Sequence, residues 1–163
     1  MNHIVGELLK ARGFTVATAE SCTGGLLASR LTDAAGSSAY VKGGVVAYTN
    51  AIKNSVLHVE SATLDEFGAV SRQTARAMAS NVRKIFGATI GLSTTGVAGP
   101  SASEGKPVGL VYVAAVGENF SAVVECHFSG TRTEIKSQAV TAALKLLIEQ
   151  LDDTTDLMSD SDD

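Results

Sequence analysis

The sequence predicts an α/β fold: a three-layer α/β/α sandwich built on a mixed, mostly parallel sheet of about five strands. Through most of the chain, short β-rich segments alternate with segments of helical periodicity. Such alternation is typical of parallel strands with helices packed on both faces. Near the C-terminus, two β-rich segments are separated by only a few residues, which predicts an antiparallel hairpin.

The first half of the chain shows the alternation. Residues 3–13, HIVGELLKARG, place apolar residues at helical spacing and end at a glycine, which predicts a helix. Asn50 is the expected N-cap of a later helix. The elements that follow residue 13 are predicted as a strand over 14–19, a helix over 24–36, a strand over 40–49 and a helix over 50–57.

The second half contains the clearest amphipathic helix, residues 71–87, with Ser71 as its N-cap and Gly87 as its stop. Thr131 and Glu134 have the spacing of a capping box at the start of the final helix, 131–151. The remaining predictions are a helical turn over 61–67, a buried strand over 88–96, a loop over 96–109 and hairpin strands over 108–116 and 120–128.

Length and charge predict one domain, residues 1–151, followed by an acidic tail, residues 152–163, that is expected to be disordered. The tail, DDTTDLMSDSDD, contains six aspartates and no basic residue. The chain carries a net charge of −4, so removing these six negative charges leaves a body of +2. A nearly neutral body predicts no nucleic-acid groove.

Several other classes of protein are disfavoured. Glu7 and Lys10 interrupt the region where a signal peptide needs an apolar run, and Pro100 interrupts the uncharged stretch 85–103, so no membrane span is predicted. Two cysteines are too few for a disulfide framework, and three scattered histidines give no metal-ligand spacing. We therefore expect a cytoplasmic protein without a metal or cofactor.

Three loops rich in hydroxyl groups and glycine are expected near strand ends: SCTGG, TTGVAGPS and SGTR. In α/β sheets, ligands usually bind beyond the carboxyl ends of the strands. In SCTGG, residues 21–25, a serine or cysteine at the start of a helix would lie among free backbone N–H groups that can stabilise an oxyanion. The alternative is that Ser21 or Thr23 only caps the helix.

A serine nucleophile needs a base, and none of the histidines lies in these loops. Lys53, at the predicted passage from a strand to a helix, would serve as the base if burial kept it neutral. An exposed charge is the ordinary role of a lysine. Cys22 is the rival nucleophile, because a helix N-terminus lowers the pKa of a thiol, but buried filler is the preferred interpretation.

Five ordered segments together resemble the CinA C-terminal domain family, also called nicotinamide-nucleotide amidohydrolase or NMN deamidase. The resemblance covers roughly residues 3–150. Longer members carry an additional N-terminal molybdopterin-binding-like domain, and the sequence resembles the stand-alone form. The segments are residues 18–53 (TAESCTGGLLASRLTDAAGSSAYVKGGVVAYTNAIK), 67–71 (FGAVS), 94–100 (TTGVAGP), 106–114 (KPVGLVYVA) and 128–132 (FSGTR).

The resemblance implies hydrolysis of the carboxamide of nicotinamide mononucleotide (NMN) to nicotinate mononucleotide and ammonia, in pyridine-nucleotide salvage. The family's nucleophile falls on Ser21, its lysine on Lys53 and its tyrosine on Tyr48. The N–H groups of Thr23, Gly24 and Gly25 are expected to hold the oxyanion. The other expected substrate-binding residues are Gly36, Ser37, Ser38, Thr95 and Arg132. A homodimer is expected from the resemblance alone.

Several alternatives stay open at this point. The chain could be a non-catalytic nucleotide-binding or competence-related interaction module, or an amidase for a different substrate. Tyr48 could relay a proton, fix Lys53 or only pack in a strand. Thr95 could bind substrate or only shape a turn. Glu20 could orient Lys53 or the loop, or make a structural hydrogen bond.

Overall fold

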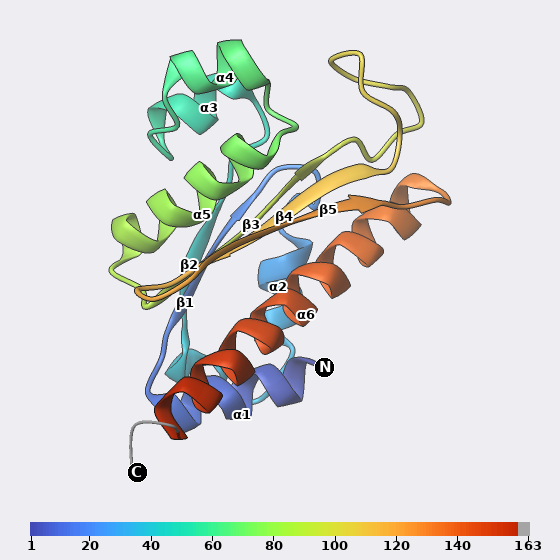
Figure 1. Cartoon of the computed structure of the whole chain (residues 1–163). Coiled ribbons are helices and arrows are strands. Elements are labelled where there is room, and N and C mark those ends of the chain that lie inside the picture. Colours follow the sequence, from blue (N-terminus) through green and yellow to red (C-terminus); the bar gives the residue numbers. More distant parts are fainter. Residues whose placement is uncertain (160–163) are drawn as a thin grey trace.

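A computed structural model of the chain, which describes residues 1–159, contains one five-stranded mixed sheet (Figure 1). The strand order is β2-β1-β3-β4-β5; β1 pairs in parallel with β2 and β3, and β4 pairs antiparallel with β3 and β5. The strands are β1 (Val16–Glu20), β2 (Val41–Val46), β3 (Ile90–Gly96), β4 (Leu110–Val116) and β5 (Ser121–His127). The predicted fold class and the hairpin are confirmed.

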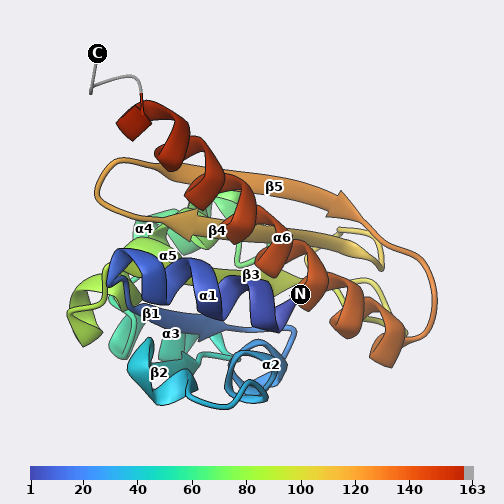
Figure 2. The same ribbon diagram turned by 90° about the horizontal axis from the view of Figure 1, so that it is seen from below.

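Helices cover both faces of the sheet and make the two outer layers (Figures 1 and 2). One face packs against α1 (Asn2–Arg12), α2 (Leu26–Thr32) and α6 (Arg132–Ser159), which bury the largest apolar cluster. The other face is covered mainly by α5 (Arg72–Phe86), with α3 (Asn50–Ser55) and α4 (Ser61–Phe67) beyond it. Every residue of β1 is buried, as expected for a central strand with a helix layer on each side.

Local sequence signals set several helix ends. Ser71 caps α5 by accepting a hydrogen bond from the Thr74 N–H, and Gly87 ends that helix in a left-handed conformation. Thr131 and Glu134 form the predicted capping box, with distances of 3.2 and 3.3 Å between each backbone nitrogen and the other residue's side-chain oxygen.

The predicted cap of α3 is wrong by one residue. The side chain of Thr49, not that of Asn50, accepts a hydrogen bond from the Ile52 N–H, at 3.3 Å. Asn50 is the first residue of α3 and lines the pocket described below. The threonine hydroxyl therefore frees the asparagine side chain from capping.

The final helix also differs from its predicted range. Helix α6 continues through Ser159 instead of ending at Leu151, because no glycine or proline interrupts the acidic segment. The remaining residues of the predicted disordered tail, 160–163, lie outside the described residues. None of the helices in the described part of the chain is both long and apolar enough to span a bilayer.

Candidate active site

A pocket of about 300 Å³ opens beyond the carboxyl ends of β1 and β3. This is the edge of the sheet where ligands of open α/β folds usually bind. The turn after β1, the start of α3, the segment before α5, the loop between β3 and β4, and the first residue of α6 all contribute to it. Its size is at the lower end of the range for small-molecule sites.

Ser21 lies directly after the last residue of β1 and lines this pocket. Its backbone N–H donates to the Thr94 carbonyl at 3.0 Å, which extends the parallel pairing of β1 with β3 by one residue. The residue is only 8% exposed. The strand therefore fixes the backbone of Ser21 while its hydroxyl reaches the pocket.

Lys53 reaches Ser21 from α3, which the Thr49 cap starts. Its Nζ donates to the Ser21 Oγ at 2.9 Å and to the Tyr48 carbonyl at 3.1 Å, and the residue is 1% exposed. Among the described residues, no carboxylate lies within ion-pair distance of this amine. Burial lowers the pKa of Lys53, and the negative charge of Glu104 opposes that shift, whereas Cys22 would oppose it only as a thiolate. The pair has the geometry of a hydroxyl nucleophile and a neutral amine base.

Burial shifts the pKa of Cys22 in the direction opposite to that of Lys53. Burial raises the pKa of its thiol to about 12, despite a smaller opposing contribution from Lys53. The side chain belongs to the main apolar cluster and is 5% exposed. A thiol that stays protonated at neutral pH is a poor nucleophile, so the structure favours the interpretation of Cys22 as buried filler.

The turn after Ser21 is held by the carboxylate of Glu20. Glu20 is 1% exposed, and one of its oxygens accepts hydrogen bonds from Gly25 N–H at 3.2 Å and Leu27 N–H at 2.8 Å. Its other oxygen accepts from Ala28 N–H at 3.0 Å. Glu20 therefore caps α2, and its negative charge interacts favourably with the positive N-terminal end of the helix dipole.

This arrangement corrects two expectations. Ser21 and Thr23 do not cap α2; the Thr23 hydroxyl instead donates to Glu20 at 2.5 Å and lies 2.6 Å from the Thr94 hydroxyl. The Gly24 N–H donates to the Ser21 carbonyl, and the Gly25 N–H is taken by Glu20. Neither glycine N–H is available for an oxyanion, and Thr23, Gly24 and Gly25 do not line the pocket. The glycines serve the turn, where both adopt positive φ.

We predict that Glu20→Gln lowers the free energy of unfolding by about 1–3 kcal/mol. The substitution replaces one carboxylate oxygen, which accepts hydrogen bonds from buried N–H groups, by an NH2 group that cannot accept them. Urea denaturation measures the change. The matched control is Glu149→Gln, which removes the same charge from an exposed position on α6. Equal stabilities of the two variants would contradict the capping role.

Tyr48 and Arg132 meet at the mouth of the pocket. Arg132, the first residue of α6, donates to the Tyr48 hydroxyl at 2.7 Å and to the Gly99 carbonyl. Tyr48 is 56% exposed, so it does not pack inside the sheet as one alternative held. Its backbone carbonyl contacts Lys53 and its ring hydroxyl contacts Arg132, which links the amine and the guanidinium across one residue.

Thr95 also lines the pocket, from the end of β3, and is 1% exposed. Its hydroxyl donates to the Ala69 carbonyl at 2.8 Å, which ties β3 to the segment before α5. The hydroxyl therefore has a structural partner already and acts on the pocket by fixing its wall.

Gly36, Ser37 and Ser38 are not near this pocket. They lie at the short helix η1 (Ser37–Ala39), which precedes β2 and so sits at the opposite end of the strands. Lys10 of α1 approaches Gly36 there. Their expected role in substrate binding is wrong within this single chain, because an element before a parallel strand cannot reach the edge that follows it.

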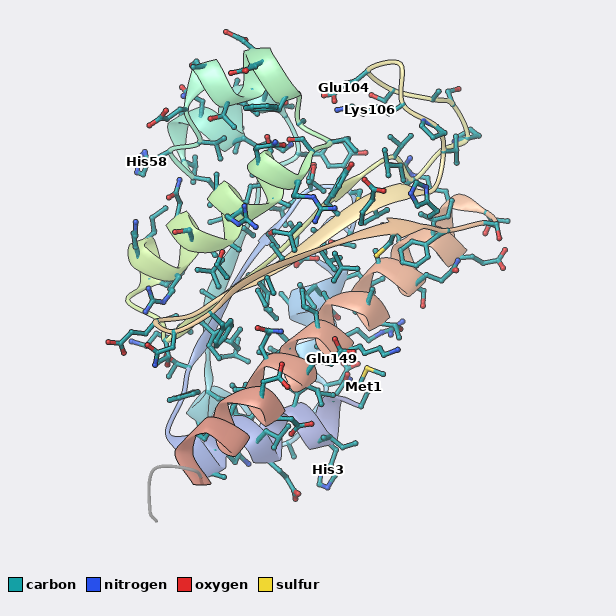
Figure 3. The ribbon with its side chains drawn as sticks, viewed as in Figure 1. Met1, His3, His58, Glu104, Lys106 and Glu149 are labelled. Atoms are coloured by element: carbon teal, nitrogen blue, oxygen red, sulfur yellow. The ribbon has the colours of Figure 1, made fainter. Side chains whose placement is uncertain are left out.

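The histidines are also remote from the pocket. His3 pairs with Glu7 on α1, and His127 contacts Glu125 on β5. His58 lies on the outer surface between α3 and α4, whereas Glu104 and Lys106 lie together on the loop at the pocket (Figure 3). Among the described lining residues there is no histidine, and Lys53 is the titratable side chain that contacts Ser21.

Comparison with known proteins agrees with this architecture. Residues 1–151 match the model of the CinA C-terminal domain. The chain belongs to this family. A relative from Desulforamulus reducens, named a competence-damage inducible protein, is 53% identical over 90% of the chain and 36% of its own length. A CinA-like protein from Koribacter versatilis is 47% identical over 93% of the chain and 37% of its own length. The chain thus spans little more than a third of these CinA relatives.

Solved structures of the CinA family have the same fold. The competence/damage inducible protein CihA from Agrobacterium tumefaciens superposes with a TM-score of 0.84 and 43% identity, over 91% of the chain and 96% of that structure. The competence damage-inducible protein A from Klebsiella pneumoniae gives a TM-score of 0.89 at 36% identity, over 92% and 94%. These names refer to competence and damage and state no reaction.

Proposed function

We propose that this CinA-family domain is a nicotinamide-nucleotide amidohydrolase that converts NMN to nicotinate mononucleotide and ammonia. The observation that carries the proposal is the buried hydrogen bond between Lys53 Nζ and Ser21 Oγ, two residues that line the pocket. A pure binding module has no need of a desolvated lysine without a described carboxylate in ion-pair distance, since burying such a charge is costly. The choice of NMN rests on the sequence resemblance, as do a cytoplasmic homodimer and a place in pyridine-nucleotide salvage.

The chemistry follows from the two side chains. Neutral Lys53 takes the proton of the Ser21 hydroxyl while the oxygen attacks the carboxamide carbon. The C–N bond then breaks, Lys53 gives the proton to the departing nitrogen, and ammonia leaves an ester on Ser21. Water attacks this ester, with Lys53 again as base, and releases the carboxylate product and the free serine.

The oxyanion needs donors other than the N–H groups of Thr23, Gly24 and Gly25 that were first expected. Ala98 and Gly99 line the pocket, and their backbone N–H groups have no protein acceptor among the described residues. We include them in the proposal as the oxyanion donors, because fixed backbone N–H groups without a protein acceptor can stabilise developing negative charge without reorganisation.

The proposal is tested by measuring ammonia release from NMN, nicotinamide riboside, nicotinamide and NAD by the purified chain. We expect NMN to be the preferred substrate. Release from none of the four, together with measurable NMN binding, would favour a non-catalytic nucleotide-binding module. Preference for another amide would retain the chemistry and replace the substrate.

Arg132 is proposed to bind the phosphate of NMN. The guanidinium borders the pocket mouth. It donates hydrogen bonds to the Tyr48 hydroxyl and the Gly99 carbonyl, and its remaining N–H groups stay available for a phosphate oxygen. A positive charge at a helix N-terminus needs a compensating interaction. The hydrogen bonds to Tyr48 and Gly99 supply that compensation, so the position of Arg132 does not by itself indicate a bound anion.

We predict that Arg132→Ala lowers kcat/KM for NMN by about tenfold or more, mainly through KM, because a hydrogen bond to a charged group is lost. Nicotinamide riboside, which lacks the phosphate, should be a poor substrate for both proteins and should be affected less by the change. Kinetics of both substrates with wild type, Arg132→Ala and Arg132→Lys measure this. An equal loss on NMN and the riboside would remove phosphate recognition from the role of Arg132.

A further inference from the structure

The loop between β3 and β4, residues 97–109, forms the outer side of the pocket. Ser101, Ser103 and Glu104 line the pocket from this loop. Glu104 adopts a φ of 55°, a left-handed conformation that side chains other than glycine rarely take. Such a conformation persists where surrounding contacts enforce it, so the contacts of Glu104 are informative.

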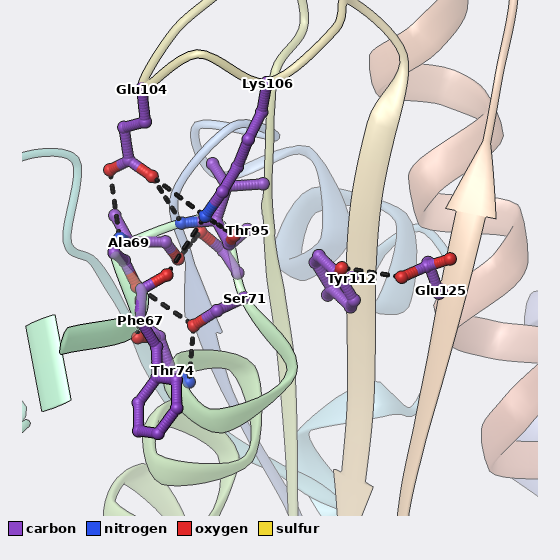
Figure 4. A network of polar contacts seen from close by, with 11 residues as sticks. Phe67, Ala69, Ser71, Thr74, Thr95, Glu104, Lys106, Tyr112 and Glu125 are labelled. Atoms are coloured by element: carbon purple, nitrogen blue, oxygen red, sulfur yellow. Dashed lines mark hydrogen bonds and ion pairs between the residues drawn. The ribbon is translucent and has the colours of Figure 1, made fainter.

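Glu104 and Lys106 fasten this loop to the segment before α5 (Figure 4). The Glu104 carboxylate accepts hydrogen bonds from Ala69 N–H at 3.0 Å and Val70 N–H at 3.2 Å, one on each oxygen. Lys106 donates to the Phe67 carbonyl at 3.0 Å and to the Val70 carbonyl, and lies 3.4 Å from the Glu104 carboxylate. Two side chains thus satisfy four backbone groups of one short segment.

Gly68 leaves the space that this arrangement needs. Its φ is 81°, and a Cβ there would lie 2.6 Å from a Glu104 carboxylate oxygen. A glycine is therefore required both by the backbone conformation and by the close approach of the carboxylate.

The fastened segment is a wall of the active site. Ala69 and Val70 line the same pocket as Ser21 and Lys53. Thr95 holds the Ala69 carbonyl from the β3 side, while Glu104 holds the Ala69 N–H from the loop side. The position of this wall is therefore set jointly by the end of β3 and by Glu104.

We propose that Glu104 is a positioning residue for the Ser21–Lys53 pair: it fixes the Ala69–Val70 wall and supplies a fixed negative charge in the pocket of Lys53. The inference rests on the proposed function in one respect, namely that Lys53 acts as a base. Lys106 assists by holding the Glu104 carboxylate and the same segment.

The electrostatic part follows from the groups around Lys53. Ser21 and the Tyr48 carbonyl are neutral partners, the Cys22 thiol stays protonated, and Arg132 borders the mouth of the pocket. Glu104 opposes the fall that burial causes in the pKa of Lys53. Burial works to raise the pKa of Glu104 itself, but the Ala69 and Val70 N–H groups and Lys106 outweigh it and lower that pKa, so Glu104 is ionised at neutral pH.

The test compares two substitutions in the full chain. Glu104→Gln removes the charge and one backbone acceptor, whereas Glu104→Asp keeps the charge and loses reach. We expect both to lower kcat/KM for NMN, by about tenfold, since each leaves at least one wall N–H without its acceptor. Only Glu104→Gln should move the midpoint of the pH–rate profile to lower pH, because the pKa of Lys53 falls further when the nearby negative charge is gone.

Glu118→Gln is the matched control, since it removes a carboxylate from the β4–β5 turn at the opposite end of the sheet. It should leave both the rate and the midpoint as in the wild type. Unchanged kcat/KM in Glu104→Gln, or the same midpoint in the Gln and Asp variants, would overturn the proposal.

An NMR titration of the Lys53 side chain in the same variants separates this proposal from the proposed function. If the wild type releases no ammonia from NMN, the proposed function fails, while a lower Lys53 pKa in Glu104→Gln than in Glu104→Asp still supports the role of Glu104. Equal Lys53 pKa values in the two variants would reject that role even in an active enzyme. Thermal melting of each variant shows that the titrated protein is folded.

Discussion

Ser21→Ala should reduce ammonia release from NMN to background without loss of the fold. Ser21 Oγ is the only atom changed, and it is the atom that Lys53 contacts at 2.9 Å. Alanine keeps the small size that the turn after β1 requires, and the backbone hydrogen bond to Thr94 is retained. The measurements are the rate of ammonia release and the midpoint of urea denaturation.

Cys22→Ala is the matched control, because it makes the same kind of truncation at the adjacent residue. We expect it to keep most of the activity, since burial keeps the thiol protonated and places it in the apolar cluster. It should cost some stability instead. If Cys22→Ala were inactive and Ser21→Ala active, the thiol would be the nucleophile and the assignment of Ser21 would be wrong.

Lys53→Gln should lower the rate by at least about 100-fold, the low end for loss of a general acid–base group. In the wild type, activity should rise with pH, because Lys53 works as a base only after its ammonium has lost a proton. Burial lowers the pKa of Lys53, so this rise should begin below the range of an ordinary lysine. The rate–pH profiles of both proteins measure the effect.

Lys42→Gln controls for the loss of a lysine as such, because Lys42 is exposed on β2. It should leave the rate and the profile unchanged. Turnover of Lys53→Gln at a near-normal rate, with the rising limb still present, would exclude Lys53 from the mechanism.

Most of the fold could be predicted because its signals are local. The Ser71 cap, the Gly87 stop and the Thr131–Glu134 capping box each depend on residues within a few positions, and all three are present in the structure. The cap of α3 was placed one residue late because Thr49 and Asn50 are both good capping residues. The end of α6 could not be located because the acidic segment carries no stop signal.

The candidate site divides in the same way. The structure brings together Ser21, Tyr48, Lys53, Thr95 and Arg132 at one pocket, as expected of residues that follow strands or begin helices at the same edge. Gly36, Ser37 and Ser38 lie before a strand and end at the opposite edge. Whether a motif residue follows a strand or precedes one therefore decides whether it lies at the pocket or at the opposite edge of the sheet.

Glu20 was expected to orient Lys53 or the loop or to make a structural hydrogen bond, and it makes structural hydrogen bonds, whereas the roles of Glu104 and Lys106 were missed. Glu20 lies among the strongest signals in the sequence, yet it caps α2 by reaching forward past the whole turn. Glu104 contacts Ala69 across a separation of 35 residues, which no local pattern encodes. A pair of opposite charges in a glycine-rich loop beside the predicted pocket was the available signal for Glu104 and Lys106.

The most direct test of the covalent serine mechanism is the product formed from NMN when hydroxylamine is present. An ester on Ser21 partitions between water and hydroxylamine, so the wild type should form the hydroxamate of the nucleotide together with nicotinate mononucleotide. Its yield should rise with hydroxylamine concentration, and Ser21→Ala should form neither product. Release of the acid alone at every hydroxylamine concentration, or hydroxamate formation by Ser21→Ala, would contradict the account.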